Sequence, residues 1–316
     1  MTTPFAFVFP GQGSQAVGML DAWGDHPAVR ATLQEASDAL GLDMAALIHG
    51  GPKEQLDLTT NTQPVMLTAG MACYRAWLQE TGLTPAIAAG HSLGEYSALV
   101  AAGALTLSQA LPLVRLRAQA MQEAVPVGQG GMAAILGLDG EAVKAGCDQA
   151  RAESCEVVEA VNFNDPKQTV IAGSKAGVEK GMELLKAAGA KRTLPLPVSA
   201  PFHSSLMKPA AERLKAALAE VQFQALQFPV INNVDVATPD AADALRDALY
   251  RQAYQPVRWV ELVQALAGRG LTHVIECGPG KVLAGMVKRI DGNLATTTVF
   301  DPASLAEARA LIGATA

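Results

Sequence analysis

The chain has 316 residues, of which 50% are hydrophobic and 17% charged, and this composition excludes an intrinsically disordered protein. A net charge of −6 without a basic cluster argues against nucleic acid as the main partner. We expect no signal peptide, no membrane span and no metal site, because the N-terminus lacks a basic region, no long apolar run occurs and the cysteines are scattered. A cytoplasmic protein with reduced cysteines is the simplest interpretation.

Strand-like and helical segments alternate along the first part of the chain. The pattern predicts, in chain order, a strand, two helices, a second strand and two further helices: residues 5–9, 26–40, 61–81, 85–90, 92–102 and 106–124. Such alternation is typical of an α/β fold with a parallel sheet covered by helices on both faces.

The order of elements changes in the middle of the chain. Here the pattern predicts a strand, a helix, two strands joined by the turn-rich segment "NDPK", a second helix and a last strand. Their residues are 131–138, 140–153, 156–163, 168–174, 176–188 and 192–198. This β-α-β-β-α-β order is the split motif of ferredoxin-like units. We therefore predict a large α/β domain made of residues 1–127 and 199–316, interrupted by a ferredoxin-like subdomain over 128–198.

Alternation resumes after the predicted insertion. The pattern predicts helices over 206–220, 240–253 and 257–268, strands over 228–234 and 272–277, and a final helix after Gly280.

The segment Gly90-His91-Ser92-Leu93-Gly94 lies between a predicted buried strand and a predicted helix. A serine in a tight strand–helix turn flanked by glycines is typical of a nucleophile elbow. The helix N-terminus then offers unpaired N–H groups to an oxyanion. The alternative is an ordinary turn in which Ser92 caps the helix.

A serine nucleophile needs a base, and histidine is the usual one near neutral pH. His91 is a poor partner, because adjacent side chains at such a turn point away from each other. His203 lies in "PVSAPFHSS", between a strand end and a helix start, and is the best candidate. Its alternative role is that of a polar residue at the helix start.

Two glycine-rich segments and two arginines have less specific patterns. "FPGQGSQ" lacks the last glycine of a dinucleotide fingerprint, and "CGPGKVLAG" lacks the residues of a phosphate loop. Arg115 and Arg117 flank the apolar stripe of the helix over 106–124, and spacing alone favours a solvated side chain for each.

Taken together, these motifs resemble a known family. "FPGQGSQ", "GHSLGEY", an arginine in the next helix, "VSAPFHS" and "ECGPGKVL" occur in this order over nearly the whole chain. They are similar to those of the acyltransferase family of fatty-acid and polyketide synthesis, in particular its bacterial malonyl-CoA:acyl-carrier-protein transacylases. The resemblance implies an α/β-hydrolase-like domain with the inserted subdomain, and malonyl transfer through a malonyl-serine.

The resemblance also implies a role for each matching residue. Ser92 would be the nucleophile and His203 its base, oriented by the backbone carbonyl of Gln252. The remaining matches are the oxyanion hole formed by the N–H groups of Gln12 and Leu93, the carboxylate-binding Arg117, and the pocket-lining Gln63, Asn162 and Phe202.

The family implies malonyl-CoA and acyl carrier protein as partners, a monomer, and no cofactor or metal, since CoA is part of the substrate. "APFH" departs from the "HAFH" of polyketide domains, which favours the free-standing enzyme of fatty-acid synthesis. The alternatives are a trans-acting acyltransferase of a polyketide pathway, a serine hydrolase or thioesterase, and a non-catalytic module that binds carrier protein.

Overall fold

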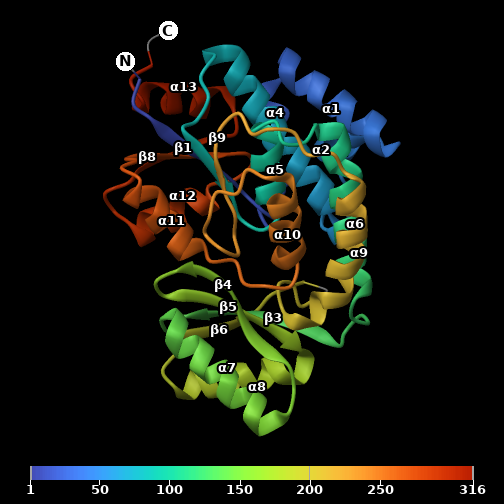
Figure 1. Ribbon diagram of the computed structural model, residues 1–316, viewed down its shortest axis with the longest axis vertical. Coiled ribbons are helices and arrows are strands. Elements are labelled where there is room, and N and C mark those ends of the chain that lie inside the picture. The colour runs from blue at the N-terminus through green and yellow to red at the C-terminus, as the bar shows by residue number, and fades with distance from the viewer. Residues whose placement is uncertain (1, 199, 315–316) are drawn as a thin grey trace.

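The computed structural model describes residues 2–198 and 200–314, which form two separate β-sheets flanked by helices (Figure 1). In sheet A every neighbouring pair of strands is parallel. The order across sheet A is β7 (Val230–Ile231), β2 (Ile87–Gly90), β1 (Phe5–Phe9), β8 (His273–Cys277) and β9 (Ala295–Val299). The predicted parallel sheet is confirmed.

Strand β1 lies at the centre of sheet A and is buried on both faces. Because side chains alternate along a strand, its three phenylalanines share one face and the smaller Ala6 and Val8 share the other. The Phe7 ring packs edge-on against Trp77 and Tyr74, with ring centroids 5.4 and 5.9 Å apart. The strand thus separates two apolar cores.

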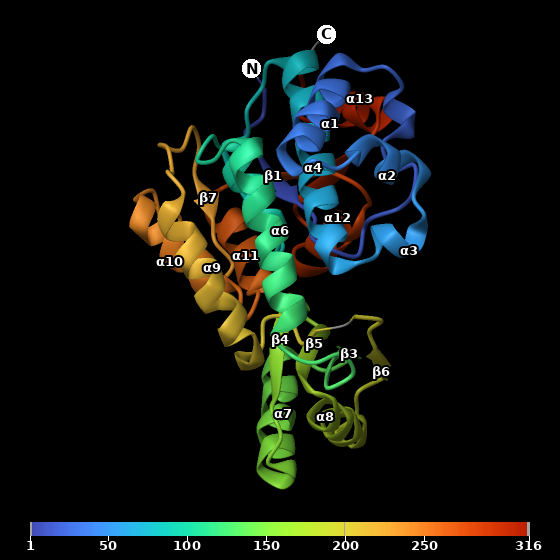
Figure 2. The same ribbon diagram turned by 90° about the vertical axis from the view of Figure 1, so that its right-hand side faces the viewer.

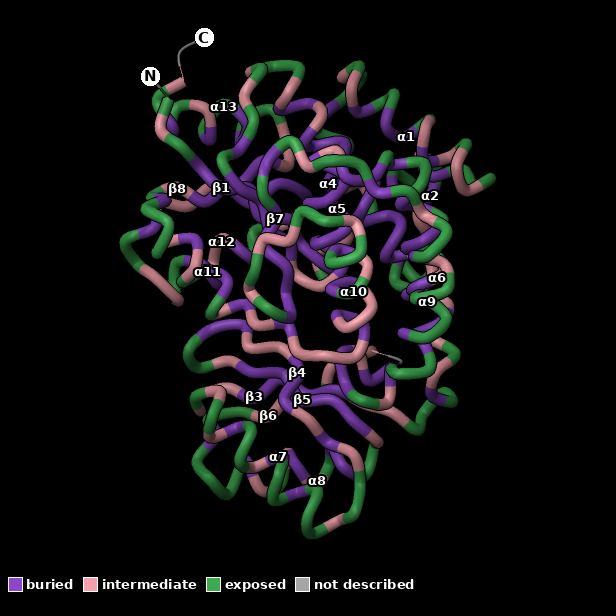
Figure 3. Tube along the Cα trace, viewed as in Figure 1, coloured by how far each residue is buried: buried purple, intermediate pink, exposed green. Residues whose placement is uncertain are grey.

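Helices cover both faces of sheet A, as the alternation predicts. The core on the phenylalanine face includes residues from α1 (Pro27–Leu40), α2 (Met44–Gly50), α3 (Lys53–Leu56), α4 (Thr59–Thr81), α5 (Gly94–Ala101), α6 (Leu107–Glu123), α9 (Lys208–Glu220), α10 (Ala242–Gln252) and α13 (Pro302–Leu311). The opposite core is closed by α11 (Trp259–Gly268) and α12 (Val282–Ile290). Figure 3 shows buried residues concentrated around these strands and inner helices.

Sheet B is antiparallel, and the predicted β-α-β-β-α-β order is present within residues 130–195. Its strands, in order across the sheet, are β4 (Val158–Asp165), β5 (Gln168–Ser174), β3 (Gly130–Leu136) and β6 (Arg192–Pro195). One face is covered by α7 (Gly140–Ser154) and α8 (Lys175–Ala187). Figure 2 shows α6 running from the helices around sheet A down to this second sheet.

The segments between the sheets hold them together. Val257, between α10 and α11, exchanges backbone hydrogen bonds with β4, accepting from Phe163 N at 3.0 Å and donating to Val161 O at 2.8 Å. Arg289 of α12 pairs with the buried Asp165 at 2.7 Å. Sheet B is thereby fixed against the side of sheet A that carries α11 and α12.

Several predicted boundaries are wrong. In place of the strand predicted over 228–234, β7 is only two residues long, because its pairing with β2 ends at Ile231. The segment predicted as a turn after residue 163 still belongs to β4 as far as Asp165. The predicted helix 206–220 begins with the 3-10 turn η2 (Ser205–Met207) before α9, and a similar turn, η1 (Asp21–Trp23), precedes α1.

The prediction also ended the regular structure too early. After α12 the chain adds β9 to the edge of sheet A and then α13. Asp301 caps α13 through a capping box with Ser304, and Pro302 follows at the first helical position. Within the described residues no helix combines the length and apolarity needed to cross a bilayer, and each of the four cysteines is free.

Candidate active site

The turn between β2 and α5 places Ser92 in a left-handed backbone conformation, with φ of 53°. A Cβ on Gly90 would lie 1.9 Å from the carbonyl carbon of Gly94, and a Cβ on Gly94 would lie 2.0 Å from the Phe9 oxygen. Neither glycine can be replaced without moving the backbone, since real Cβ atoms do not approach so closely. The turn therefore has the geometry of a nucleophile elbow.

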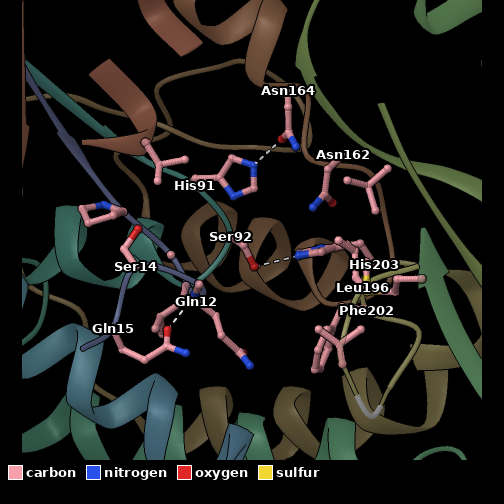
Figure 4. Close-up of a pocket in the computed structure, with 18 of the residues that line it drawn as sticks. Gln12, Ser14, Gln15, His91, Ser92, Asn162, Asn164, Leu196, Phe202 and His203 are labelled. Carbon is pink, nitrogen blue, oxygen red and sulfur yellow. Dashed lines mark hydrogen bonds between the residues drawn. The ribbon is translucent and has the colours of Figure 1, made fainter. Parts of the chain in front are cut away.

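His203 meets Ser92 across 111 positions of sequence, with Nε2 2.7 Å from Oγ (Figure 4). Its Nδ1 lies 2.8 Å from the backbone oxygen of Gln252. A carbonyl accepts only, so Nδ1 carries the proton and the lone pair of Nε2 faces the serine hydroxyl. Burial and, next, the charge of Arg117 lower the pKa of His203 to about 3, which keeps the imidazole neutral and able to accept a proton.

Arg117 of α6 is buried beside the nucleophile, with only 2% of its surface exposed. Nη2 lies 3.2 Å from Ser92 Oγ and 3.0 Å from Gln252 Oε1, and Nη1 donates to Gln63 Oε1 at 2.7 Å. Its Nε is buried without a partner among the described residues. Spacing favoured a solvated side chain, and for Arg117 that interpretation is wrong.

Arg115, by contrast, is exposed and does not line the pocket that holds Ser92. Its guanidinium donates to the backbone oxygen of Leu40. The helical period cannot separate the two arginines, because both flank the same apolar stripe. The difference arises from what covers each flank once α6 is packed.

The loop after β1 packs directly against the elbow. A Cβ on Gly11 would lie 2.6 Å from the backbone oxygen of His91. Next to it, Gln12 lines the same pocket as Ser92 (Figure 4). Within the described part of the chain, nothing accepts a hydrogen bond from the backbone N–H of Gln12 or of Leu93. Two free donors beside a serine hydroxyl match what an oxyanion hole requires.

These side chains open into a cavity of about 740 Å³ between the two sheets. Its lining includes Gln12, Gln63, Ser92, Leu93, Arg117, Asn162, Phe202 and His203. Gln252 lies behind His203, outside the lining. Sheet B and the chain after it add an apolar surface made of Met132, Ala134, Val170, Leu196 and Val198.

Comparison with known proteins decides the family. The model of the family described as "Acyl transferase domain" matches residues 6–298. The chain belongs to this family. This acyl transferase is 53% identical over 307 residues to the malonyl CoA-acyl carrier protein transacylase of Escherichia coli K12, covering 97% of the chain and 99% of that protein. It is 46% identical to the Bacillus subtilis protein of the same name, covering 95% and 94%.

Solved structures agree. The acyl-carrier-protein S-malonyltransferase of Burkholderia pseudomallei is 66% identical and superimposes with a TM-score of 0.95, covering 97% of this chain and 99% of that one. A malonyl-transacylase solved in complex with a type II PKS acyl-carrier protein is 50% identical with a TM-score of 0.95 over the same shares. The resemblance found in the sequence, and the fold that it implied, are confirmed.

Two buried residues beside the nucleophile turn of the acyl transferase were not found from the sequence. Asn233 accepts from the Ser92 N–H at 2.7 Å and donates to Gly90 O at 2.7 Å. Glu95 accepts from the Asn233 N–H and from Gln252 Nε2 through the same oxygen. Burial raises the pKa of Glu95 to about 7, although these hydrogen bonds and Arg117 oppose the shift. Glu95 follows the serine motif closely, whereas no signal marks Asn233.

Proposed function

We propose that the protein transfers the malonyl group of malonyl-CoA to the phosphopantetheine thiol of acyl carrier protein, supplying extender units for fatty-acid biosynthesis. The observation that carries the proposal is a buried guanidinium 3.2 Å from the hydroxyl of a serine–histidine pair. The names of relatives more than 50% identical over nearly the whole chain support it.

In the first step Ser92 Oγ attacks the thioester carbonyl of malonyl-CoA while His203 Nε2 takes the hydroxyl proton. The negative charge of the tetrahedral intermediate rests on the former carbonyl oxygen, which the N–H groups of Gln12 and Leu93 stabilise. Losing one such donor costs about 3–4 kcal/mol of barrier. The carbon–sulfur bond then breaks, and the imidazolium returns its proton to the departing CoA thiolate.

In the second step the phosphopantetheine thiol of the carrier protein enters the emptied cavity. His203 takes the thiol proton, and the sulfur attacks the carbonyl of malonyl-Ser92. Collapse of the second intermediate breaks the bond to Ser92 Oγ, which regains its proton from the imidazolium. The proposed steps use no cofactor, since a thioester is already activated and these residues supply the base and the donors.

Arg117 explains why malonyl is the acyl group. In malonyl the free carboxylate is one methylene from the reacting carbonyl, so it must lie close to Ser92 Oγ. A guanidinium binds a carboxylate through parallel, charge-assisted hydrogen bonds, and the unpartnered Nε beside Nη2 provides a donor pair. An acetyl group would leave the buried cation without an anion.

A hydrolase is the weaker candidate. In an α/β-hydrolase a carboxylate orients the catalytic histidine, whereas His203 Nδ1 faces the neutral carbonyl of Gln252. Intact geometry of Ser92 and His203 also disfavours a module that only binds carrier protein. Supply of a polyketide pathway is the second candidate function, favoured by the 50% identity to a transacylase solved with a polyketide carrier protein. We also propose a cytoplasmic enzyme, which the free cysteines support. A monomer is proposed from the family resemblance alone.

The test is incubation with malonyl-CoA labelled in the malonyl group. The transferase retains stable label on Ser92, and added carrier protein of the fatty-acid type removes it as malonyl thioester. Release of free malonate without carrier protein would show a hydrolase instead, and absence of label would show a binding module. Faster discharge by a polyketide carrier protein than by a fatty-acid one would favour the second candidate.

A further inference from the structure

The backbone of Ser92 is held on both sides by buried side-chain amides. Its φ of 53° is sparsely populated by residues other than glycine and persists only where the surroundings enforce it. Asn233 Oδ1 accepts a hydrogen bond from the Ser92 N–H at 2.7 Å. Gln252 Nε2 donates to the Ser92 carbonyl oxygen at 2.9 Å. Both peptide groups that flank the nucleophile are therefore fixed in orientation.

The side chain of Asn233 takes the place of backbone hydrogen bonds beyond the end of the β2–β7 ladder. Strands β2 and β7 pair only at Ala88–Val230 and Ala89–Ile231. Just beyond, the fully buried Asn233 presents its side-chain amide to the end of β2, with Nδ2 2.7 Å from Gly90 O. A primary amide offers a donor and an acceptor side by side, as a backbone strand would. It thus satisfies both polar groups of the elbow that the shortened strand leaves unpaired.

The two amides converge on one carboxylate oxygen. Glu95 Oε2 accepts from the backbone N–H of Asn233 at 2.9 Å and from Gln252 Nε2 at 3.0 Å. Glu95 lies in the first turn of α5, and its own N–H donates to Ser92 O at 3.1 Å. The acceptor that orders both amides is therefore built into the helix that the elbow starts.

We infer that Asn233 and Glu95 are positioning residues for the reaction proposed above, on which this inference rests. The peptide that joins Ser92 to Leu93 carries the carbonyl held by Gln252 at one end and the Leu93 N–H, an oxyanion donor, at the other. Rotation of this peptide would move the hydroxyl and the donor together. Glu95 restrains this peptide through Gln252 and through its own N–H, and Asn233 restrains the preceding peptide through the Ser92 N–H. Neither residue lines the cavity.

The main test compares Asn233→Ala with Asn232→Ala. Asn232 is a matched control, because it is buried in the same segment but its side chain bonds only Asp235 among the residues that the structure describes. Removing the Asn233 side chain leaves its backbone N–H on Glu95. We expect the rate of malonyl-Ser92 formation at saturating malonyl-CoA, followed by rapid quench and intact mass, to fall about 10²-fold.

Comparing the maximal rate with the half-saturating malonyl-CoA concentration distinguishes a positioning role from a loss of substrate binding. Asn233 does not contact Arg117, so the malonyl-CoA concentration that gives half of the maximal rate should stay within twofold. The Asn232→Ala variant should form malonyl-enzyme within threefold of the wild-type rate. The inference would be overturned if Asn233→Ala formed malonyl-enzyme as fast as the control. It would also be overturned if the substitution changed only the half-saturating malonyl-CoA concentration.

Three further variants keep the test decisive if Asn233→Ala does not fold. Asn233→Asp preserves volume but turns an oxygen toward Gly90 O, so acylation should slow at least tenfold; a rate within threefold of wild type would overturn the role. Glu95→Ala should also slow acylation, whereas Glu95→Gln, which keeps an acceptor oxygen, should restore most of the rate. Wild-type enzyme in the same assay tests malonyl transfer itself, so the two failures are distinguishable.

Discussion

The two walls of the cavity differ in chemistry. The reaction wall consists of Gln12, Ser92, Leu93, Arg117 and His203, and it contains a buried cation and two residues with positive φ. The sheet B wall consists of Met132, Ala134, Asn162, Val170 and Leu196, with mostly apolar side chains on ordinary strands or beside them. Strain and buried charge cost stability and are confined to the reaction wall.

Because of this difference, substitutions on the two walls should impair different steps. Changes on the reaction wall should lower the rate of the chemical steps or the choice of acyl group. Changes on the sheet B wall should weaken substrate binding while the chemistry of bound substrate continues.

Ser92→Ala should give the largest effect. Without the hydroxyl no covalent malonyl-enzyme forms, and transfer should fall by at least about 10⁴-fold. His203→Ala should lose nearly as much, and the double variant should lose little more, because the pair acts as a unit. Steady-state transfer to carrier protein measures both. A double variant whose loss equals the product of the single losses would contradict the paired geometry.

Arg117→Ala should separate two substrates. Malonyl transfer should fall about 10²-fold or more, because a carboxylate loses its buried cation. Acetyl transfer should hold or rise, since no unpaired charge then remains in the cavity. Arg115→Ala is the matched control, from the same helix but exposed, and should change neither rate. Equal losses for both acyl groups would show that Arg117 supports structure rather than selection.

Asn162→Ala should give a smaller effect of a different kind. Asn162 Oδ1 is buried without a partner among the described residues, in the lining of the cavity. An amide N–H of the pantetheine arm would satisfy it, so its removal should raise the half-saturating malonyl-CoA concentration about fivefold. The maximal rate should stay unchanged. A fall in the maximal rate instead would break the division between the walls.

The sequence revealed residues whose role depends on a local motif. Ser92 lies in a glycine-flanked turn and His203 in a loop between a strand end and a helix start, and the resemblance of ordered motifs added Gln12. Spacing did not reveal the burial of Arg117, because a helical period describes one helix and not what packs on its flanks. The role of Asn233 could not be predicted for the same reason. Its role arises only where β7 ends beside β2, a pairing between segments more than a hundred residues apart.

The fold, too, could be predicted from the sequence only in part. Short apolar runs between helical segments predicted both sheets, because β1 is apolar at every position and the three long strands of sheet B have buried apolar stretches. The last strand and helix were missed although Asp301 and Pro302 form a helix-start signal. Edge strand β9, "ATTTV", has only its last two residues buried, so its hydrophobic pattern is weak. Periodicity predicts what the core requires and is least informative at edges.

The smallest expected effect is a near absence of pH dependence in acylation. An ordinary histidine with a pKa of 6.5 would lose about tenfold of its basic form between pH 7.5 and 5.5. Burial and Arg117 lower the pKa of His203 to about 3, so its basic form predominates throughout this range. The rate of malonyl-Ser92 formation should therefore change less than about twofold on account of His203.

Glu95 must be separated from this measurement, because its pKa is raised to about 7 and it becomes protonated as the pH falls through that value. The Glu95→Gln variant has no carboxyl group to titrate and is the control. A pH dependence present in wild type and absent from Glu95→Gln belongs to Glu95. A loss centred near pH 6.5 in both enzymes would mean that the imidazolium is stabilised, contrary to its burial beside a cation. The reaction wall would then be more solvated than its buried cation indicates.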